Sequence, residues 1–535
     1  MQKSWIDTPT DLAIVKELQT SLAIHPTFCK LLAQRGIIDY TSAKQYFRPQ
    51  LTDLHDPFLM AGMEVAVRRI QTALEREEKI LIYGDYDVDG TTSVAMLYTF
   101  LADLHPYLDY YIPDRYKEGY GLSYQGIEYA KQKGIALIIT LDCGIRAVSQ
   151  VNFATQEHID IIICDHHIPD KVLPSACAIL DPKQQQCTYP FKELSGCGVG
   201  LKLAQAICER LNMEQEHWVS LLDFVVISIA ADIVPMQGEN RILAYYGLQQ
   251  LNETKRIGLR ALARKSSRTF PLSISDIVFG IAPIINAAGR LADAEQAVRL
   301  LLASTKQGAA DLSSILELRN KMRREFDERT IREAKAQFEQ LPERGNHRSI
   351  VLFQPHWHKG VVGITAARMV EQYYRPTIIL TESQGRVVGS ARSVRGFNVY
   401  EAIERCADLL INFGGHAHAA GLTMSPENVL AFQDRFEAVV STFIEETALV
   451  PEIEVNATLR LHDISSAFWK ILKQFAPFGP RNRNPVFVSK GVRDTGYSKV
   501  LRGNHLRLAI QQDTSEVYYG IAFGMGDKYE QVKSG

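Results

Sequence analysis

Three aspartates stand on alternate residues in the segment "ILIYGDYDVDGTTSVAMLYTFLADL". Asp85, Asp87 and Asp89 follow one apolar run and precede a longer one. Carboxylates this close repel one another, and in a low-dielectric setting the repulsion raises their pKa values unless cations offset it. We therefore expect this turn to bind positive charge.

The first half of the chain contains four short, β-branched runs that each lead into an aspartate. They are "KILIYGD", "ALIITLDCG", "IDIIICDHH" and "ACAILDP", and the helical patterns between them are typical of an α/β fold with a parallel, doubly wound sheet. Open α/β sheets bind ligands at the carboxyl ends of their strands. We expect one sheet edge to gather Asp87, Asp89, Asp142, Asp165, His166 and His167, with Asp181 as a further candidate.

These side chains are of the type that binds divalent metal ions. Carboxylates and imidazoles are ligands of Mg²⁺ and Mn²⁺, and Asp232, which closes the apolar segment "LLDFVVISIAADIVP", adds a charge that needs a partner. The set is large enough for two ions that share a bridging carboxylate. Two ions ~3.5 to 4 Å apart acidify a bridging water and neutralise the charge that grows on a phosphoryl group. The predicted chemistry is hydrolysis of a phosphoester.

Each motif has a structural alternative. The sequence "DVDG" resembles the start of a calcium-binding EF-hand loop, but Met96 stands where that loop needs a glutamate, and a strand precedes it instead of a helix. A single aspartate at a strand end is more often a turn residue or a helix cap than a ligand. Four such elements at successive strand ends favour the metal site.

The composition indicates a globular, soluble protein. With 535 residues, 46% of them hydrophobic and 22% charged, the chain is long enough for three or four domains at ~150 residues each. We expect no membrane association and a cytoplasmic location, because no apolar run approaches ~20 residues and the N-terminus lacks the order of a secretion signal.

The eight cysteines include no C-x-x-C pair, which disfavours a zinc module or a disulfide framework. A net charge of −2 does not indicate nucleic-acid binding, although a cluster of acidic ligands masks basic residues elsewhere.

The patterns along the chain predict five segments. We expect a connecting helix near "LSSILELRNKMRREFDERTIREAKAQFEQL" rather than a coiled coil, because its heptads do not persist. The last strands fit a small β-barrel, which we expect to be incomplete. The segments are a helical cap (1–60), the parallel-sheet unit (61–235), a helical connector (236–345), a second α/β unit (346–445) and the barrel (446–535).

Several motifs resemble a known superfamily. "GDYDVDG", "LDCG", "CDHH" and "ADIVP", in this order, resemble the four motifs of the DHH phosphoesterases, and "NFGGHAHAAG" resembles the signature of the DHHA1 domain that follows in one branch. "INAAGRL", "WHKGVVGITAAR" and "GSARS" also match, and the barrel resembles an OB-fold. The combination is similar to the branch of bacterial single-strand-specific 5′→3′ exodeoxyribonucleases, over nearly the whole chain.

The resemblance implies roles for the candidate metal ligands. Two ions, Mn²⁺ or Mg²⁺, would be held by Asp87, Asp89, Asp142, His166 and Asp232, with Asp142 as the bridge. Asp85 joins the metal set because Tyr83 occupies the place where related pyrophosphatases supply a histidine ligand. Asp165 would orient His166 and fix its tautomer, and His167 would stay off the metals and donate to the scissile phosphate.

The resemblance also implies a substrate site. Arginines, hydroxyls and backbone N–H groups at helix starts hold phosphodiester backbones, and "HKGVVGITAAR" is expected to begin such a helix. The residues that fit and match family positions are Arg290, Ser390, Arg392, Ser393, Gly415 and His416, with Trp357 or His358 available for stacking. The alternative for Gly415 and its neighbouring glycines is that they only permit a tight turn. An OB-like barrel would add stacking and electrostatic contacts to single strands.

Three functions are compatible with these observations. The first is a single-stranded-DNA-specific exonuclease that releases 5′-mononucleotides by two-metal hydrolysis in DNA recombination and repair; the resemblance implies single-strand-binding protein and a helicase as partners, and we expect a monomer. The second is an oligoribonuclease or small-nucleotide phosphodiesterase, which the C-terminal barrel disfavours. The third is a non-catalytic single-strand-binding scaffold with a decayed site, which the presence of all principal ligands disfavours.

Overall fold

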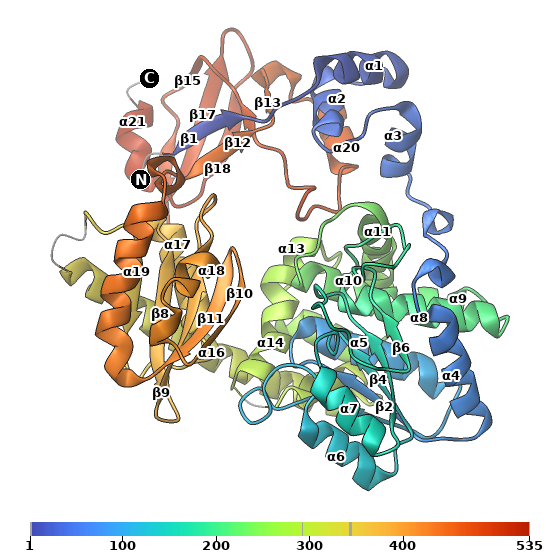
Figure 1. Ribbon diagram of the computed structural model, residues 1–535. Coiled ribbons are helices and arrows are strands. Elements are labelled where there is room, and N and C mark those ends of the chain that lie inside the picture. The colour runs from blue at the N-terminus through green and yellow to red at the C-terminus, as the bar shows by residue number, and fades with distance from the viewer. Residues whose placement is uncertain (1–2, 292, 342–344, 534–535) are drawn as a thin grey trace. The chain divides into compact units, whose positions relative to one another are not determined.

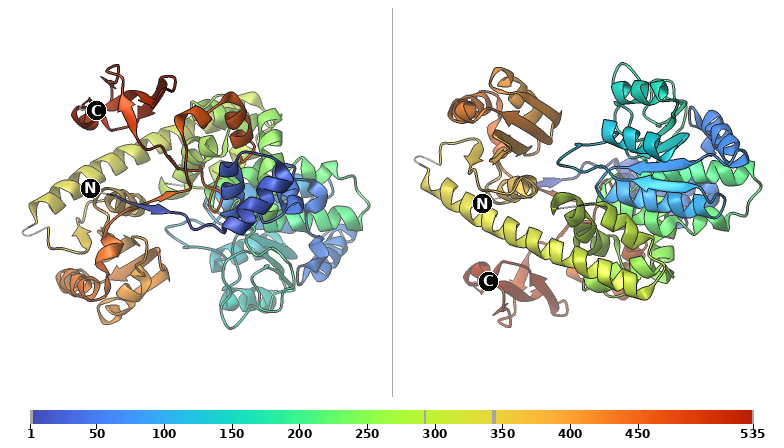
Figure 2. Two further views of the ribbon diagram at one scale, coloured as in Figure 1. Left: turned by 90° about the horizontal axis from the view of Figure 1, so that it is seen from above. Right: turned by 90° about the horizontal axis from the view of Figure 1, so that it is seen from below.

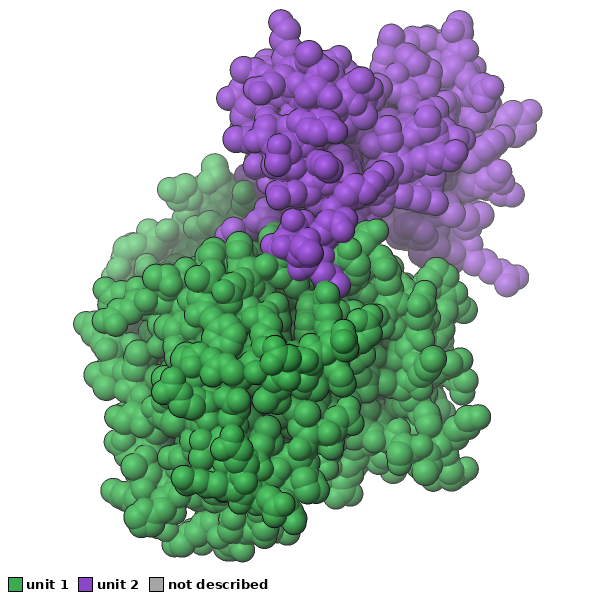
Figure 3. All heavy atoms as spheres, turned by 90° about the vertical axis from the view of Figure 1, so that its right-hand side faces the viewer, with its two compact units in different colours: residues 1–3, 54–234, 238–451 green, residues 4–53, 235–237, 452–535 purple. Residues whose placement is uncertain are grey.

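The structure is a computed structural model that describes residues 3–291, 293–341 and 345–533. The chain divides into two compact units (Figure 3). Unit 1 comprises residues 1–3, 54–234 and 238–451, and unit 2 comprises residues 4–53, 235–237 and 452–535. Each unit is described by itself.

Unit 1 contains the parallel sheet that the four apolar runs predicted, so this part of the fold is confirmed. Its strand order is β3-β2-β4-β5-β6, and every neighbouring pair is parallel. All residues of β2 and β4 are buried, as expected for strands covered on both faces. The strands are β2 (Ile80–Gly84), β3 (Leu108–Tyr111), β4 (Leu137–Leu141), β5 (Asp160–Cys164) and β6 (Ala178–Leu180).

Helices cover both faces of this sheet (Figure 1; Figure 2). On one face α6 and α7 close an apolar core that includes Tyr83, Ile138 and Ile163. On the other face α4, α5 and α8 contact the strands, and α10 packs against α5, α8 and α11. These helices are α4 (Met63–Glu75), α5 (Val88–Ala102), α6 (Tyr124–Lys133), α7 (Val148–Gln156), α8 (Gly196–Arg210), α9 (Glu216–Val219), α10 (Leu222–Ala231) and α11 (Gly238–Glu253).

The predicted connecting helix is α16 (Lys306–Gln340), which runs for 35 residues. It is less solvated than the sequence predicted, because α12, α14 and α17 pack along it and bury a stripe of its side chains. Ile274–Leu291 is the one stretch of the described residues that is long and apolar enough to cross a membrane, and half of it is buried, as in a core helix. The remaining helices here are α12 (Ile257–Lys265), α13 (Ile274–Asp276), α14 (Ala282–Leu291) and α15 (Glu295–Leu301).

The second predicted α/β segment is also confirmed. Its sheet has the order β10-β11-β9-β8-β7, with β7 and β8 parallel and the other pairs antiparallel. The end of α16 supplies Ile331, Ala334 and Phe338 to a core with α17. The elements are β7 (Ile350–Phe353), α17 (Val362–Tyr373), β8 (Thr377–Ser383), β9 (Arg386–Arg392), α18 (Val399–Glu404), β10 (Asn412–His416), β11 (Ala419–Met424) and α19 (Val429–Phe443).

Unit 2 joins the two ends of the described chain. Strand β1 (Ser4–Asp7) pairs in parallel with β12 (Glu452–Val455), and Phe28 of α2 lies 4.4 Å from Phe468 of α20 between ring centroids. The other elements are α1 (Leu12–Leu22), α2 (Pro26–Ala33), α3 (Tyr40–Phe47), β13 (Ala457–Thr458), α20 (Ser466–Lys473), β14 (Phe487–Val488), β15 (Val492–Asp494), β16 (Lys499–Leu501), β17 (His505–Gln512), β18 (Tyr518–Ala522) and α21 (Tyr529–Lys533).

A buried ion pair ties α8 to α11 in unit 1. Lys202 Nζ lies 2.7 Å from Glu239 Oε1, and both side chains are 1% exposed. Glu239 also accepts hydrogen bonds from the Tyr189 hydroxyl and from the backbone N–H of His55. Such a pair is costly to break, because the remaining charge stays buried without its counter-ion.

We expect Lys202→Met to lower the free energy of unfolding by about 3–5 kcal/mol, since it leaves the Glu239 carboxylate buried and unpaired. The double variant Lys202→Met/Glu239→Gln should recover part of the loss. Urea denaturation followed by circular dichroism measures both. A single variant as stable as the wild type would contradict the prediction.

Candidate metal centre and phosphate site

Strand register places the predicted ligands at one level of the sheet edge. Gly84, Leu141 and Cys164 are in register across β2, β4 and β5. The residues that follow them are Asp85, Asp142 and Asp165, so the three carboxylates leave the sheet side by side. Asp232 reaches the same place from the end of α10.

The ligand atoms converge on His166. Its Nε2 lies 3.1 Å from Asp142 Oδ1, 3.7 Å from Asp232 Oδ2 and 3.8 Å from Asp89 Oδ2. Two groups of three have ligand atoms within 4.8 Å of one another: Asp89, His166 and Asp232, and Asp142, His166 and His167. The distances of 3.7 and 3.8 Å are too long for hydrogen bonds. They are typical of ligand atoms arranged around a common centre.

The electrostatics of this cluster match a cation site. Burial, followed by the charges of Asp89 and Asp87, raises the pKa values of Asp142 and Asp232 well above their usual range. Burial lowers the pKa of His166, which keeps its imidazole neutral and able to act as a ligand. Among the described residues the buried His166 Nδ1 has no hydrogen-bond partner. The residues present therefore fit a divalent metal centre.

Asp89 is held by a network that the sequence analysis missed. Its carboxylate accepts hydrogen bonds from the backbone N–H groups of Gly196 (2.7 Å) and Cys197 (2.9 Å) at the start of α8, and from the Ser228 hydroxyl (2.6 Å). A Cβ at Gly196 would lie 2.6 Å from the Cβ of Asp142, so only glycine allows this approach. The "SGCG" glycines were a signal that could have located this contact; Ser228, inside an apolar helix, gave none.

Asp85 and Asp87 belong to neither of the two groups of three potential metal ligands. Asp87 caps α5 by accepting from the backbone N–H of Gly90 (3.1 Å), and its charge contributes to the raised pKa of Asp142. Asp85 is 1% exposed and accepts from the backbone N–H of Gly121, while its Oδ2 has no hydrogen-bond partner among the described residues. Burial and then Asp87 raise the pKa of Asp85 well above its usual value.

The contact of Asp165 differs from the expected one. Its Oδ1 lies 2.7 Å from Nδ1 of His167 and accepts from the backbone N–H of His166, so it pairs with the ring of His167 and not with that of His166. Burial lowers the pKa of His167, but the hydrogen bond and charge of Asp165 outweigh it and raise that pKa overall. Asp165 thus fixes the ring of His167 beside the candidate ligands, and the role of His167 as a donor to the phosphate stays a prediction.

The predicted substrate residues include an arginine cluster. Arg290 lies in the last turn of α14 and donates to the carbonyl of Gly360 (3.1 Å). Burial, followed by the charges of Arg115, Arg323 and Arg392, lowers the pKa of Arg290 to about 10. Neighbouring cations that lower one another's pKa values repel, and a bound anion offsets this repulsion. Arg115 and Arg323 were not predicted; Arg115 stands in the loop after β3, where the strand-end rule could have found it.

Ser390 and Arg392 complete this cluster. Arg392 Nη1 lies 3.1 Å from Ser390 Oγ, and a Cβ at Gly363 would lie 3.0 Å from Ser390 Oγ, which places the first turn of α17 against both side chains. His416 lies level with Arg392, because both are in register with Ala419 of β11. A helix start, a hydroxyl and a guanidinium are groups that bind phosphate in proteins, so this cluster is a candidate phosphate site.

The structure corrects one of the other predicted substrate residues and leaves the roles of the remaining three as predictions. Trp357 is 3% exposed, belongs to the core beside α17 and donates through Nε1 to Glu333, which corrects its predicted stacking role. One face of His358 is covered by Phe326 at 5.2 Å between centroids. Ser393 donates its hydroxyl to Phe397. Gly415 has φ +148°, and a Cβ there would lie 2.3 Å from the carbonyl oxygen of Ala419, so the hairpin alone requires glycine.

A wide cavity in unit 1 is lined by more basic than acidic side chains. It has a volume of about 920 Å³ and lies between the first half of α16 and the segment from α12 to α14. Among its lining residues Glu317 is the one acid, whereas six are cationic: Lys265, Arg268, Lys321, Arg323, Arg324 and Arg368. Arg323 belongs to both this cavity and the cluster around Arg290.

The fold and the site define a phosphoesterase of the DHH type. The pattern of the DHH family, N-terminal domain, matches residues 79–229, that of the DHHA1 domain matches residues 346–442, and that of the RecJ OB domain matches residues 455–535. The last match confirms the predicted OB-like fold of the C-terminal segment.

The chain belongs to the RecJ family of single-stranded-DNA-specific exonucleases. It is 38% identical over 526 residues to RecJ of Bacillus subtilis, covering 97% of this chain but 66% of that protein, just under two thirds of its length. It is 33% identical over 535 residues to RecJ of Haemophilus influenzae, covering 95% of this chain and 91% of that protein.

Solved structures agree with this assignment. RecJ of Thermus thermophilus in complex with Mn²⁺ matches with a TM-score of 0.84 and 28% identity, over 98% of this chain and 74% of that chain. An exonuclease RecJ bound to manganese matches with a TM-score of 0.65 and 32% identity, over 75% of this chain and 99% of that chain.

We expect Asp142→Asn to raise the free energy of unfolding of the metal-free protein, because it removes one buried charge from beside Asp89, Asp87 and Asp232. The folded-state pKa of Asp142 lies above its unfolded value of ~3.9, so its carboxylate costs nothing below that pH and increasingly destabilises the fold as pH rises. The stability gain of the variant should therefore grow as the pH rises above ~3.9, by ~1.4 kcal/mol for each pH unit until the raised folded-state pKa is reached.

Urea denaturation in EDTA measures this difference, and the same titration with Mn²⁺ provides the control, in which the wild type should gain more stability than the variant. A variant less stable than the wild type in EDTA, or a gap that narrows with rising pH, would show that the carboxylates do not repel one another in the way described.

Proposed function

We propose that this chain digests single-stranded DNA from its 5′ end and releases 5′-mononucleotides, using two Mn²⁺ or Mg²⁺ ions. The observation that carries the proposal is the presence of two opposite charge clusters in one compact unit: the carboxylates around His166 and the arginines around Arg290. Family membership supports the substrate, and solved RecJ structures with Mn²⁺ and Mg²⁺ support the ions.

The proposed metal ligands are Asp87, Asp89, Asp142, His166 and Asp232, with Asp85 as a further candidate. Two bound ions would supply an acidified water and neutralise the charge on the phosphoryl group. We assign the bridging position to Asp142, since its side chain is 3% exposed and its Oδ1 is the carboxylate oxygen closest to His166 Nε2. The 29% exposed Asp232 would close the centre on its open side.

His167 is proposed to donate a hydrogen bond to the scissile phosphate. Its ring nitrogen lies within 4.8 Å of the ligand atoms of Asp142 and His166, so it faces the centre without joining the ligands of the other group. Asp165 positions the ring and keeps the proton on it. A hydrogen bond from this ring would stabilise the negative charge that the phosphate carries into the transition state.

The 5′-terminal phosphate is proposed to bind at Arg290, Ser390, Arg392 and the first turn of α17. His416, level with Arg392, is the remaining candidate for this site. The cluster is within the electrostatic reach of Asp87, so the terminal phosphate and the metal centre are neighbours. Hydrolysis one nucleotide from a gripped end is what distinguishes an exonuclease from an endonuclease.

The two rival functions are less well supported. The match to the RecJ OB domain over residues 455–535 favours a polymeric substrate over a dinucleotide. The convergence of Asp89, Asp142, His166 and Asp232 favours a working site over a decayed one.

The cellular setting is proposed from family membership. We propose a cytoplasmic monomer that acts in DNA recombination and repair with single-strand-binding protein and a helicase. We also propose that the chain is organised as the five sequence segments 1–60, 61–235, 236–345, 346–445 and 446–535, in which the first and last contribute to one compact unit.

The direct test is digestion of 5′-phosphorylated single-stranded DNA, labelled at either end, with Mn²⁺. The wild type should release mononucleotides in order from the 5′ end, and Asp142→Ala should abolish release because it removes the proposed bridging ligand. Asp103→Ala, at an exposed position at the other end of α5, is the matched control and should behave as the wild type. Release from the 3′ end, or an active Asp142→Ala, would refute the proposal.

A second prediction concerns the terminal phosphate. We expect the wild type to prefer 5′-phosphorylated over 5′-hydroxyl strands, and Arg392→Ala to reduce that ratio of kcat/KM by about 10- to 150-fold, since hydrogen bonds to charged groups contribute ~1.5–3 kcal/mol. Arg386→Ala, at the exposed start of the same strand, should leave the ratio unchanged. A ratio that Arg392→Ala does not alter would place the 5′ end elsewhere.

A further inference from the structure

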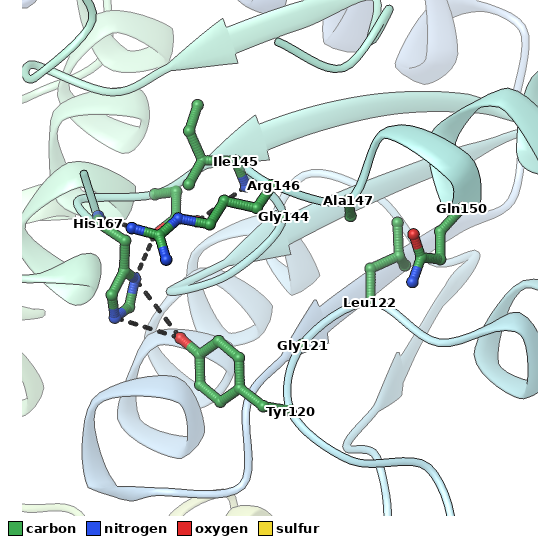
Figure 4. A pocket seen from close by; sticks show the side chains of 10 residues that line it. Tyr120, Gly121, Leu122, Gly144, Ile145, Arg146, Ala147, Gln150 and His167 are labelled. Carbon is green, nitrogen blue, oxygen red and sulfur yellow. Dashed lines mark hydrogen bonds and ion pairs between the residues drawn. The ribbon is translucent and has the colours of Figure 1, made fainter. Parts of the chain in front are cut away.

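A cavity of about 210 Å³ opens beside the metal centre and has no role in the function described above (Figure 4). Two loops form it: the one after β3 contributes Tyr120 and Leu122, and the one after β4 contributes Ile145 and Arg146. Gln150 of α7 also lines it. The cavity thus sits at the carboxyl end of the sheet, on the side of β4 and β5.

One end of the cavity is shared with the catalytic machinery. His167 and Asp165 line it, and the His167 ring nitrogen lies within 4.8 Å of the ligand atoms of Asp142 and His166. Figure 4 shows His167 at one end and Gln150 at the other. A nucleotide whose phosphate contacts His167 can therefore place its base in the cavity.

The walls of the cavity are chemically mixed. The Tyr120 side is aromatic: the residue is 53% exposed, yet its hydroxyl donates to the carbonyl of Asp142 (2.8 Å), which fixes the ring. Leu122 and Ile145, 3% and 2% exposed, supply apolar surface. The Arg146 guanidinium is held in place by the carbonyl of Ile168 at 3.0 and 2.7 Å.

This combination selects a flat heterocycle with polar edges. A fixed aromatic ring and a guanidinium plane are stacking partners for nucleobases, and the amide of Gln150 can donate to and accept from a base edge. A phosphate is disfavoured, because the carboxylate of Asp165 lies in the wall. Apolar side chains and a single carboxylate do not make a metal site.

We propose that this cavity binds the base of the nucleotide on the 3′ side of the scissile bond. The inference rests on the proposed exonuclease function and adds a substrate subsite to it. The terminal nucleotide would span from the arginine cluster to the metal centre. The end of α14 that carries Arg290 packs on the turn after β2, because a Cβ at Gly289 would lie 2.4 Å from the carbonyl oxygen of Tyr86. The cavity is lined mainly by residues that follow β4 and β5, and a strand that continues in this direction would bring the next nucleotide to it.

The subsite gives the chain a chemical means of rejecting duplex DNA. A base can enter the cavity only after it leaves its stack and its pairing partner, which costs little in a single strand and more in a duplex. The selection would act at each cleavage step, next to the reacting phosphate.

The first arm of the test uses the wild type and 5′-phosphorylated single strands that carry one abasic residue at position 1, 2 or 3. An abasic residue at position 2 should lower kcat/KM for release of the first nucleotide by about five- to 150-fold, the effect of one lost base–aromatic stack. Positions 1 and 3 should have smaller effects. Equal kcat/KM for all three strands, or the largest loss at position 1 or 3, would overturn the proposal.

The second arm fills the cavity from its far end. Gln150→Trp should lower kcat/KM on unmodified DNA and should remove the additional loss at abasic position 2, because no base enters in either case. Ser149→Trp, at the exposed neighbouring position outside the lining, should respond to abasic DNA as the wild type does. If Gln150→Trp still shows the full loss of kcat/KM at abasic position 2, the subsite is overturned. If the wild type releases no mononucleotide from unmodified single strands, the exonuclease function is overturned with it.

Discussion

The main constraint on the structure of unit 1 is the electrostatic repulsion between the carboxylates buried around His166, which the rest of the unit must offset. Asp89, Asp142 and Asp232 approach one imidazole nitrogen to within 3.1–3.8 Å. A fold that places them there must oppose their repulsion with dipoles before any ion binds. The start of α8 does this for Asp89, through two backbone N–H groups and the favourable end of the helix dipole.

Backbone strain is concentrated at the same place. Asp142 has φ +60°, and Ile233, directly after Asp232, has φ +59°, a conformation that is costly for a β-branched residue. Asp142 is held in it by two bonds, from its own N–H to the carbonyl of Cys164 and from the Tyr120 hydroxyl to its carbonyl. The stability of the surrounding sheet and helices therefore maintains a centre that is unfavourable in the absence of cations.

The sequence predicted the parts of this site that follow from periodicity. Apolar runs that end in aspartate imply parallel strands, and strand register then carries Asp85, Asp142 and Asp165 to one edge. The sequence could not predict which ring Asp165 contacts: in the structure its carboxylate pairs with the ring of His167 and not with that of His166. Trp357 matched a motif, but its burial depends on α16, which is distant in the chain. The joining of β1 to β12 in unit 2 is likewise a long-range contact without a local signal.

The two charge clusters of unit 1 are coupled through Asp87. Its carboxylate raises the pKa of Asp142 and Asp232, and it supports the charge of Arg290. Cations bound at the acidic cluster would offset the field of Asp87, which would leave the arginines with less negative charge nearby. A phosphate bound at the proposed site of Arg290 and Arg392 would restore that charge. Bound metal ions would remove negative charge near the arginines, and a bound phosphate would replace it. A chain with a net charge of only −2 thus contains two strong charge clusters of opposite sign close together.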